Sequence, residues 1–257
     1  MRPRSAWLDA CVFALCLWAG ASIAQAAEIK VLSAGAMKGI VADLAESFRQ
    51  ETGHTVAIST GTAGEIRQKM TAGDSADVVF VTDAVIEQLA ATRVVVADTR
   101  SDIARTGIGV AVREGTPPPD ISTPDALKQT LLAARSIVYV DPAIGATSGI
   151  HFVGVLQRLG IAEAVKDKTV LWPGGYAAEA LLKGQAELCV HQISEILPVK
   201  GVTLVGPLPR ELQKITTYSA ALSSRTTTPE VGRAFIAFVS RPSFKAKLAA
   251  AGLDYRE

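Results

Sequence analysis

Cysteine is scarce in this chain of 257 residues, which contains three. Cys11 and Cys16 lie in an N-terminal segment that we expect to be removed on export, so Cys189 alone would remain in the mature protein. A single cysteine cannot form an internal disulfide, and its apolar neighbours indicate a small core side chain rather than a nucleophile. The mature fold must therefore be stabilised by its hydrophobic core alone, which a chain of this length can provide.

Aromatic residues and an excess of charge are also lacking. Phe, Trp and Tyr make up 5% of the chain, and 26 Lys and Arg residues balance 25 Asp and Glu residues. A nucleic-acid surface needs basic residues interleaved with rings that stack on bases. We therefore expect no nucleic-acid partner and a small ligand instead. The few aromatic residues also disfavour a sugar-binding cleft, and we expect the protein to be a monomer.

Long apolar runs are absent except near the N-terminus. Residues 1–27 combine Arg2 and Arg4, an apolar centre at 12–18 and the sequence Ala24-Gln25-Ala26, which are the three parts of a cleaved secretory signal. The apolar centre is shorter than the roughly 20 residues that a membrane-spanning helix needs. We expect a mature chain that begins near Glu28 and works outside the cytoplasm.

Strand-like and helix-like segments alternate along the whole mature chain. Short β-branched or apolar segments indicate strands, and apolar residues three and four apart indicate helices. The expected strands are 28–33, 55–59, 77–81, 107–112, 136–140, 170–172, 187–190, 202–205 and 215–223, and the expected helices are 40–52, 66–72, 84–91, 124–134, 152–159, 177–183, 229–239 and 242–251. This alternation predicts an α/β fold with mainly parallel sheets and helices on both faces.

A change of sequence character divides the chain into two groups of these units. The proline-rich segment 115–119 reads as extended surface chain that can be neither a helix nor a central strand. We expect one lobe from residues 28–106 and 215–257, and a second lobe from residues 107–214. Turns at the carboxyl ends of the strands would then face one another across a cleft between the lobes.

Four short turns rich in glycine and hydroxyl residues each join a predicted strand to a predicted helix. They cover residues 33–36, 59–64, 145–149 and 173–176. Such turns place backbone N–H groups and hydroxyls at helix N-termini, where the positive end of the helix dipole favours a bound anion. The turns contain no Arg or Lys, so we expect neutral dipoles to hold the anion, with Lys38 as the nearby cation.

The candidate ligand-binding residues are members of these turns together with one histidine. We select Ser33, Gly35, Ala36, Thr62, Ala63, Thr147, Ser148, Gly175, Tyr176 and His191. Each has a structural alternative, because glycines serve turns, hydroxyl residues cap helices, and a tyrosine or histidine can pack in a core. Glu195 follows His191 by four residues, and it would fix the orientation or charge of a histidine that donates to the anion.

Signals for catalysis, metal binding and cofactors are weak. The chain has no P-loop, no G-x-S-x-G sequence and no cysteine paired with an activating histidine. His54 and His151 lack partners at the spacing of metal ligands. We expect a binding protein that is not an enzyme and needs no metal or cofactor. A secreted serine hydrolase that uses Ser148 is the alternative of a different class.

The order of these motifs resembles the periplasmic molybdate-binding protein family, the type II solute-binding components of ABC importers. The resemblance covers nearly all of the mature chain and is carried by the blocks 29–37, 59–70, 73–78, 141–149, 187–195 and 207–214. It implies a two-lobed periplasmic-binding-protein type II fold that closes on a molybdate-like oxyanion by hinge motion. It also implies a periplasmic location and delivery of the ligand to the membrane permease of an ABC importer.

The family's ligand positions fall on named residues of this chain. The first turn of the family usually holds a serine, and here it holds Ala36, which has no hydroxyl. Further positions fall at Thr62, in the turn 146–148 and at Gly174 and Gly175. A position that often holds tyrosine falls at His191, which can carry charge near neutral pH. The anion expected from the resemblance is molybdate or tungstate, and an organic carboxylate is the alternative.

Overall fold

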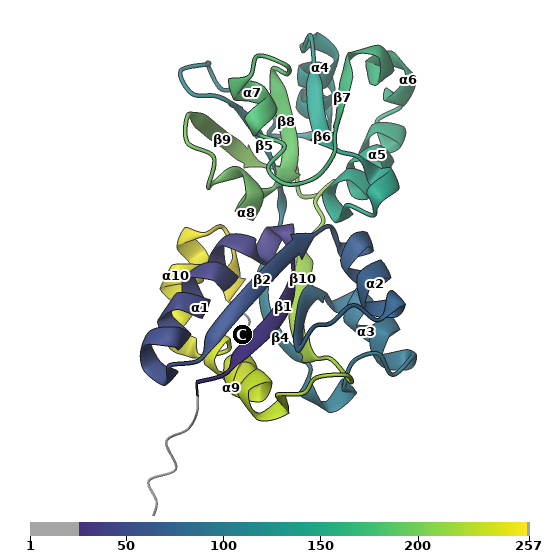
Figure 1. Cartoon of the computed structure of the whole chain (residues 1–257). Coiled ribbons are helices and arrows are strands. Elements are labelled where there is room, and N and C mark those ends of the chain that lie inside the picture. The colour runs from purple at the N-terminus through teal and green to yellow at the C-terminus, as the bar shows by residue number, and fades with distance from the viewer. Residues whose placement is uncertain (1–25, 256–257) are drawn as a thin grey trace, which may run out of the picture.

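The computed structural model describes residues 26–255 and shows two lobes, each built on its own β-sheet (Figure 1). The larger sheet has the strand order β11-β4-β10-β3-β1-β2. Its strands are β1 (Glu28–Ala34), β2 (Thr55–Gly61), β3 (Val78–Thr82), β4 (Ser101–Thr106), β10 (Thr216–Leu222) and β11 (Asp254–Tyr255). The predicted signal segment lies outside the described residues except for its last two positions.

The smaller sheet forms the second lobe and has the strand order β7-β6-β8-β5-β9. Its strands are β5 (Ile108–Arg113), β6 (Ile137–Val140), β7 (Thr169–Trp172), β8 (Leu188–Gln192) and β9 (Val202–Pro207). The chain passes between the lobes twice, between β4 and β5 and again between β9 and β10. The α/β fold with two sheets is thus confirmed, and the lobe boundaries 28–106, 107–214 and 215–257 stay a prediction.

Helices cover both faces of each sheet (Figure 1). The larger lobe carries α1 (Lys38–Thr52), α2 (Ala63–Ala72), α3 (Asp83–Ala91), α9 (Pro229–Val239) and α10 (Lys245–Ala250), and the smaller lobe carries α4 (Pro124–Ala133), α5 (Thr147–Arg158), α6 (Ala162–Val165), α7 (Glu179–Leu182) and α8 (Ile193–Ile196). Helix α1 shows why they form: it buries Ile40, Val41, Leu44 and Phe48 on one face. It ends at Gly53, whose φ of 77° suits a residue without a side chain.

The expectation of mainly parallel sheets needs a correction, because both sheets are mixed. Strand β1 pairs in parallel with β2 and β3, and β6 pairs in parallel with β7 and β8. Strand β10 is antiparallel to β3 and β4, and β5 is antiparallel to β8 and β9. Strand β11 is also antiparallel to β4. Strands β5 and β10 directly follow the passages between the lobes, so each enters its sheet from the opposite side.

Each lobe has its own hydrophobic core. In the larger lobe, Phe48 packs against Phe235 and Phe238 with ring centroids 5.1 and 5.3 Å apart, and Phe80 joins the cluster through Phe235. In the smaller lobe, Tyr139 packs edge-on against Phe152 at 5.1 Å. Cys189 is fully buried, and no helix among residues 26–255 is long and apolar enough to cross a membrane.

Candidate functional site

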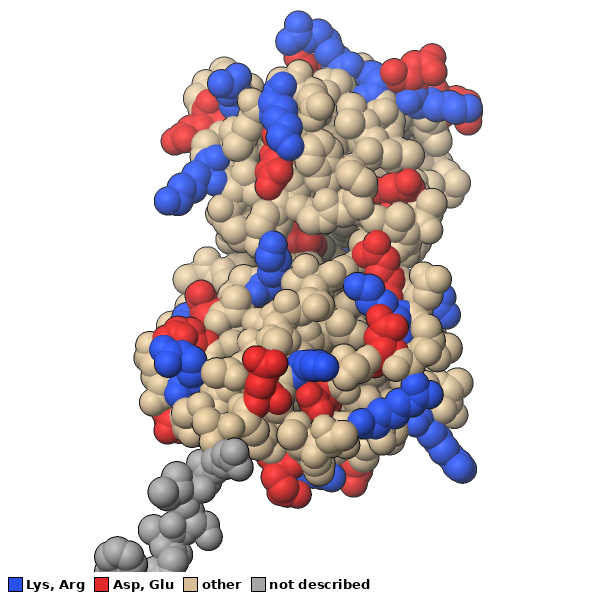
Figure 2. All heavy atoms as spheres, viewed as in Figure 1, with Lys and Arg blue, Asp and Glu red and all other residues tan. Residues whose placement is uncertain are grey.

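A cavity of about 240 Å³ lies between the two lobes, where the four predicted turns converge. The larger lobe contributes the end of β1, the end of β2 and the first residues of α2. The smaller lobe contributes the start of α5, the turn 173–176, the end of β8 and Glu195 of α8. Figure 2 shows the molecule hollowed between the lobes, with acidic and basic side chains interspersed over the visible face.

The structure brings together nine of the ten residues selected from the sequence. The cavity is lined by Gly35, Ala36, Thr62, Ala63, Thr147, Ser148, Gly175, Tyr176 and His191. Ser33 is the exception, because its side chain is fully buried and its hydroxyl donates to the carbonyl of Ala34 at 3.2 Å. Ser33 therefore belongs to the core side of β1 and does not line the cavity.

Two helix N-termini open onto the cavity without a side-chain cap. Helix α5 follows Ala146, and the short 3₁₀ turn Gly35–Met37 that leads into α1 follows Ala34; neither of these preceding residues caps its helix. Unpaired N–H groups at a helix start, together with the positive end of the dipole, attract an anion. The two helices come from different lobes, so an anion between them would be held from both sides.

Helix α2 differs because its N-terminus is already capped. The Thr62 hydroxyl accepts from the N–H of Glu65 at 3.2 Å, and the Glu65 carboxylate accepts from the N–H of Thr62 at 2.7 Å. The same Thr62 hydroxyl donates to the carbonyl of Ile144 in the other lobe at 2.5 Å. The Thr62 hydroxyl therefore donates its proton to a contact between the lobes, and the ligand bond expected from the sequence stays a prediction.

A close backbone contact lies next to Thr62. The N–H of Gly64 donates to the carbonyl of Gly145 in the other lobe at 3.1 Å. A Cβ added at Gly64 would lie 2.7 Å from the Cα of Gly145, so only a residue without a side chain fits in this arrangement. We call Thr62, Gly64, Ile144 and Gly145 the interlobe latch.

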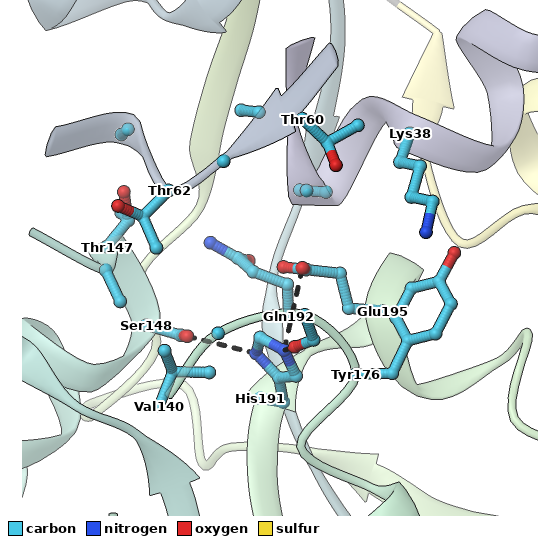
Figure 3. A pocket seen from close by; sticks show the side chains of 18 of the residues that line it. Lys38, Thr60, Thr62, Val140, Thr147, Ser148, Tyr176, His191, Gln192 and Glu195 are labelled. Atoms are coloured by element: carbon cyan, nitrogen blue, oxygen red, sulfur yellow. Dashed lines mark hydrogen bonds and ion pairs between the residues drawn. The ribbon is translucent and has the colours of Figure 1, made fainter. Parts of the chain in front are cut away.

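His191 sits at the floor of the cavity with both ring nitrogens engaged (Figure 3). Its Nδ1 lies 3.1 Å from the Ser148 hydroxyl, and its Nε2 lies 3.0 Å from the carbonyl of Gly175. The Glu195 carboxylate is 3.6 Å from Nε2. The contact predicted from the four-residue spacing exists, although His191 is in strand β8 and Glu195 in helix α8.

Glu195 is a buried carboxyl group that faces the other lobe. Burial raises the pKa of Glu195, while the nearby His191 and Lys38 oppose that shift. A Cβ added at Gly35 would collide with its carboxylate oxygen, so Glu195 packs directly on the first turn of the larger lobe. The Lys38 ammonium lies 5.2 Å from the centre of the Tyr176 ring at the edge of the cavity.

Several lining residues escaped the sequence analysis. Thr60 lies within the second turn, Glu65 directly follows that turn, and Gln192 directly follows His191 in β8. Their position beside selected residues is the signal that could have found them. Tyr218 comes from β10, far away in the sequence, and nothing in its surroundings marked it. The amide of Gln192 donates to the Tyr218 hydroxyl at 3.3 Å, and its carbonyl oxygen is buried without a partner among the described residues.

The arrangement differs from a serine hydrolase site. In a Ser-His-Asp triad the serine bonds Nε2 of the histidine and the carboxylate bonds Nδ1. Here Ser148 lies on Nδ1, and Nε2 faces Gly175 and Glu195. Burial raises the pKa of the Cys189 thiol, so this residue is not an activated nucleophile. No cluster of three potential metal ligands occurs within residues 26–255.

Comparison with known proteins places this geometry among related folds. Residues 29–254 match the family model described as bacterial extracellular solute-binding protein. The chain is 32% identical over 218 residues to an aconitate isomerase of a Pseudomonas species, and the match covers 82% of each protein.

Solved structures with similar folds include two proteins named for inorganic oxyanions. The periplasmic molybdate-binding protein of Azotobacter vinelandii superposes with a TM-score of 0.76 at 22% identity and covers 89% of this chain and 100% of its own. The sulfate-binding protein SubI of Mycobacterium tuberculosis superposes with a TM-score of 0.70 at 17% identity and covers 90% of this chain and 88% of its own. At these identities the likeness concerns the fold.

Proposed function

The chain belongs to the bacterial extracellular solute-binding proteins, and on that premise we propose that it captures a small organic carboxylate between its two lobes. The carrying observation is that uncapped helix N-termini from both lobes open onto one cavity that also contains a buried carboxyl, Glu195. The free N–H groups suit carboxylate oxygens.

The size of the cavity favours an organic anion over molybdate or tungstate. Its volume is about 240 Å³. A tetrahedral oxyanion has five heavy atoms and would leave much of this space unfilled. Ala36 also lacks the hydroxyl that the molybdate-binding family usually places at this position.

The partner in this proposal is the membrane permease of an ABC importer, and the location is the periplasm. The family and the predicted signal at residues 1–27 support both statements. The latch between the lobes supports a mechanism in which hinge closure encloses the ligand and removes it from water, because hydrogen bonds to a charged acceptor strengthen in a desolvated site.

A thermal-shift panel tests the ligand class. We expect trans-aconitate, citrate or tricarballylate to raise the melting temperature, because a ligand that binds only the folded state stabilises it. Molybdate, tungstate, sulfate and phosphate should give no shift. Stabilisation by molybdate and tungstate alone would assign the cleft to inorganic oxyanions. The variant Ala36→Ser restores the missing hydroxyl, and we expect it to gain oxyanion affinity without losing carboxylate binding.

A second candidate function is the isomerisation of aconitate by proton transfer. It is favoured by the sequence similarity to an aconitate isomerase and by an acid–base pair, His191 and Glu195, on the cavity wall. A carboxyl whose pKa burial raises is a suitable base near neutral pH. It would take a proton from the CH₂ group beside the double bond and return one to the far carbon, which moves the double bond.

Proton NMR in D₂O distinguishes the two functions. An isomerase would convert cis-aconitate into trans-aconitate and introduce deuterium into the methylene group, and Glu195→Gln would abolish both changes while the protein stays folded. A binding protein would leave the spectrum of either isomer unchanged over hours while still giving a thermal shift.

A further inference from the structure

The Ser148 hydroxyl has one proton, and its direction depends on His191. Ser148 is 2% exposed, its oxygen lies 3.1 Å from Nδ1 of His191, and both residues line the cavity (Figure 3). A hydroxyl can donate to a bare ring nitrogen or accept from a protonated one. The presence or absence of a proton on Nδ1 therefore decides whether the Ser148 hydroxyl points its proton or its lone pairs toward a ligand.

The other ring nitrogen has less freedom. Nε2 of His191 lies 3.0 Å from the carbonyl oxygen of Gly175, which can only accept a hydrogen bond. Nε2 must therefore carry a proton in either state of the ring. In the neutral ring Nδ1 carries no proton and accepts a hydrogen bond from the Ser148 hydroxyl. In the charged ring Nδ1 carries a proton and donates a hydrogen bond to the Ser148 oxygen.

These two states treat an anion in opposite ways. With the neutral ring, the Ser148 oxygen turns only lone pairs toward the cavity and repels a carboxylate. With the charged ring, the Ser148 O–H is free to donate, and the ring adds a positive charge close to the ligand. Hydrogen bonds from or through charged groups are stronger than those between neutral groups.

The groups around this pair favour the charged ring when an anion is present. Glu195 of α8 lies 3.6 Å from Nε2 and stabilises the imidazolium. Lys38 of α1 and Tyr176 of the turn 173–176 face Glu195 from the cavity edge, and Tyr218 of β10 and Cys189 of β8 face it from the interior. Burial raises the pKa of both tyrosines and of the cysteine, so these three groups stay neutral.

We propose that the cleft takes up one proton together with its carboxylate ligand, and that His191 is the positioning residue that turns the Ser148 hydroxyl toward that ligand. The inference rests on the proposed function. It adds that the site recognises an anion and a proton jointly, so the affinity for the anion falls as the pH rises.

Isothermal titration calorimetry with trans-aconitate measures this coupling. Titrations in buffers of different ionisation enthalpy count the protons taken up on binding, at about pH 6 and again above pH 8. At the higher pH, we expect the wild type to take up close to one proton for each ligand bound. The variant His191→Gln should take up close to one proton fewer. The matched control His54→Gln removes a histidine that bonds the N–H of Ala27 outside the cavity, and it should behave as the wild type does.

The variant Ser148→Ala tests the role of the hydroxyl. It should bind about tenfold more weakly than the wild type at low pH. At high pH, where Ser148 no longer donates, it should bind at least as tightly as the wild type. Long-range proton–nitrogen NMR should show one protonated nitrogen in the free His191 ring and two in the complex. Binding without extra proton uptake would overturn this inference alone, and absence of binding at every pH would overturn the proposed function with it.

Discussion

Glu195 connects the two lobes at the scale of a single residue. It is 7% exposed, it lies beside His191, and it packs on Gly35 of the other lobe. Burial disfavours the charged form of an isolated carboxyl, so the folded state holds the Glu195 proton more tightly than the unfolded chain does. The residue thus links the stability of the protein to pH.

Replacement of Glu195 tests this link. Because the folded-state pKa is raised above the ordinary value of 4.5, the folded state binds more protons than the unfolded state between those two pKa values. The stabilising contribution is full below pH 4.5 and is lost as the pH rises through the raised pKa. We expect Glu195→Gln to match the wild type near pH 4 and to melt at a higher temperature near pH 8. A melting difference that does not change with pH would contradict this assignment.

Thr62 gives a second prediction at this scale. Thr62→Val removes the N-cap of α2 and the bond to Ile144, and loss of such a cap costs about 1 kcal/mol. Thr62→Ser keeps the hydroxyl and serves as the control. Urea unfolding should show a loss of about 1 kcal/mol for the valine variant and a much smaller loss for serine. A loss for the serine variant with none for the valine variant would mean that the methyl group, rather than the hydroxyl, matters here.

At the scale of elements, helix α2 approaches the turn before α5 so closely that two glycines touch. The Cα atoms of Gly64 and Gly145 leave no room for a side chain on either residue. Gly145 has a φ of 74°, which itself favours glycine, whereas Gly64 lies within α2 in helical conformation. The contact between the lobes therefore requires glycine at position 64, whereas the helical backbone conformation of Gly64 does not.

Gly64→Ala separates these two effects. Alanine favours a helix over glycine by about 1 kcal/mol, while its Cβ holds the lobes apart. We expect the ligand-free variant to be at least as stable as the wild type and to bind the ligand several-fold more weakly in calorimetry. Gly154→Ala in α5 is the matched control, because no atom lies within 4 Å of an added Cβ there. It should gain stability and keep full affinity, and unchanged affinity in Gly64→Ala would contradict the latch.

Elements with regular patterns were predictable from the sequence, and elements set by distant partners were not. Helix α1 and strand β3 follow from apolar spacing alone. Strand β4 was missed because its sequence places Asp102 and Arg105 among few apolar residues. Its polar groups are satisfied from far along the chain, since the Ser219 hydroxyl of β10 donates to Asp102 at 2.7 Å.

The same distinction applies to the site. The turns could be located because glycine and hydroxyl residues mark them in the sequence, and nine of the ten selected residues line the cavity. The use of each hydroxyl could not be predicted, since the partners of Thr62 and Ser148 lie 82 and 43 residues away. Only the folded chain shows that the Thr62 hydroxyl bonds Ile144 of the other lobe and that the Ser148 hydroxyl bonds His191.

At the scale of the whole molecule, the hydrophobic clusters of one lobe are separate from those of the other. The lobes are joined by two passages of chain, by the interlobe latch and by contacts such as that of Glu195 with Gly35. The Phe48 and Phe235 cluster stabilises the larger lobe, and Tyr139 with Phe152 stabilises the smaller one. No described side chain belongs to both cores. A destabilising substitution in the core of one lobe should therefore leave the local stability of the other lobe unchanged.

Hydrogen exchange of core variants tests this independence. Phe235→Ala should cost about 3–5 kcal/mol and lower amide protection in β1, β3 and β10, while β6 and β8 keep theirs. Phe152→Ala is the matched variant in the other lobe and should show the reverse pattern. A uniform loss of protection in both lobes from either variant would show that the molecule unfolds as one cooperative unit.

The position of β10 between β3 and β4 also determines when the cavity between the lobes can form during synthesis of the chain. A chain that emerges with its N-terminus first exposes β1–β4 early, but their sheet stays divided until residues 216–222 arrive. The smaller lobe, which is continuous in sequence, can fold before that. The cavity needs both lobes, so it forms only when nearly the whole chain has been released. A polypeptide that lacks residues 216–222 would thus have no complete larger lobe to form one wall of the cavity.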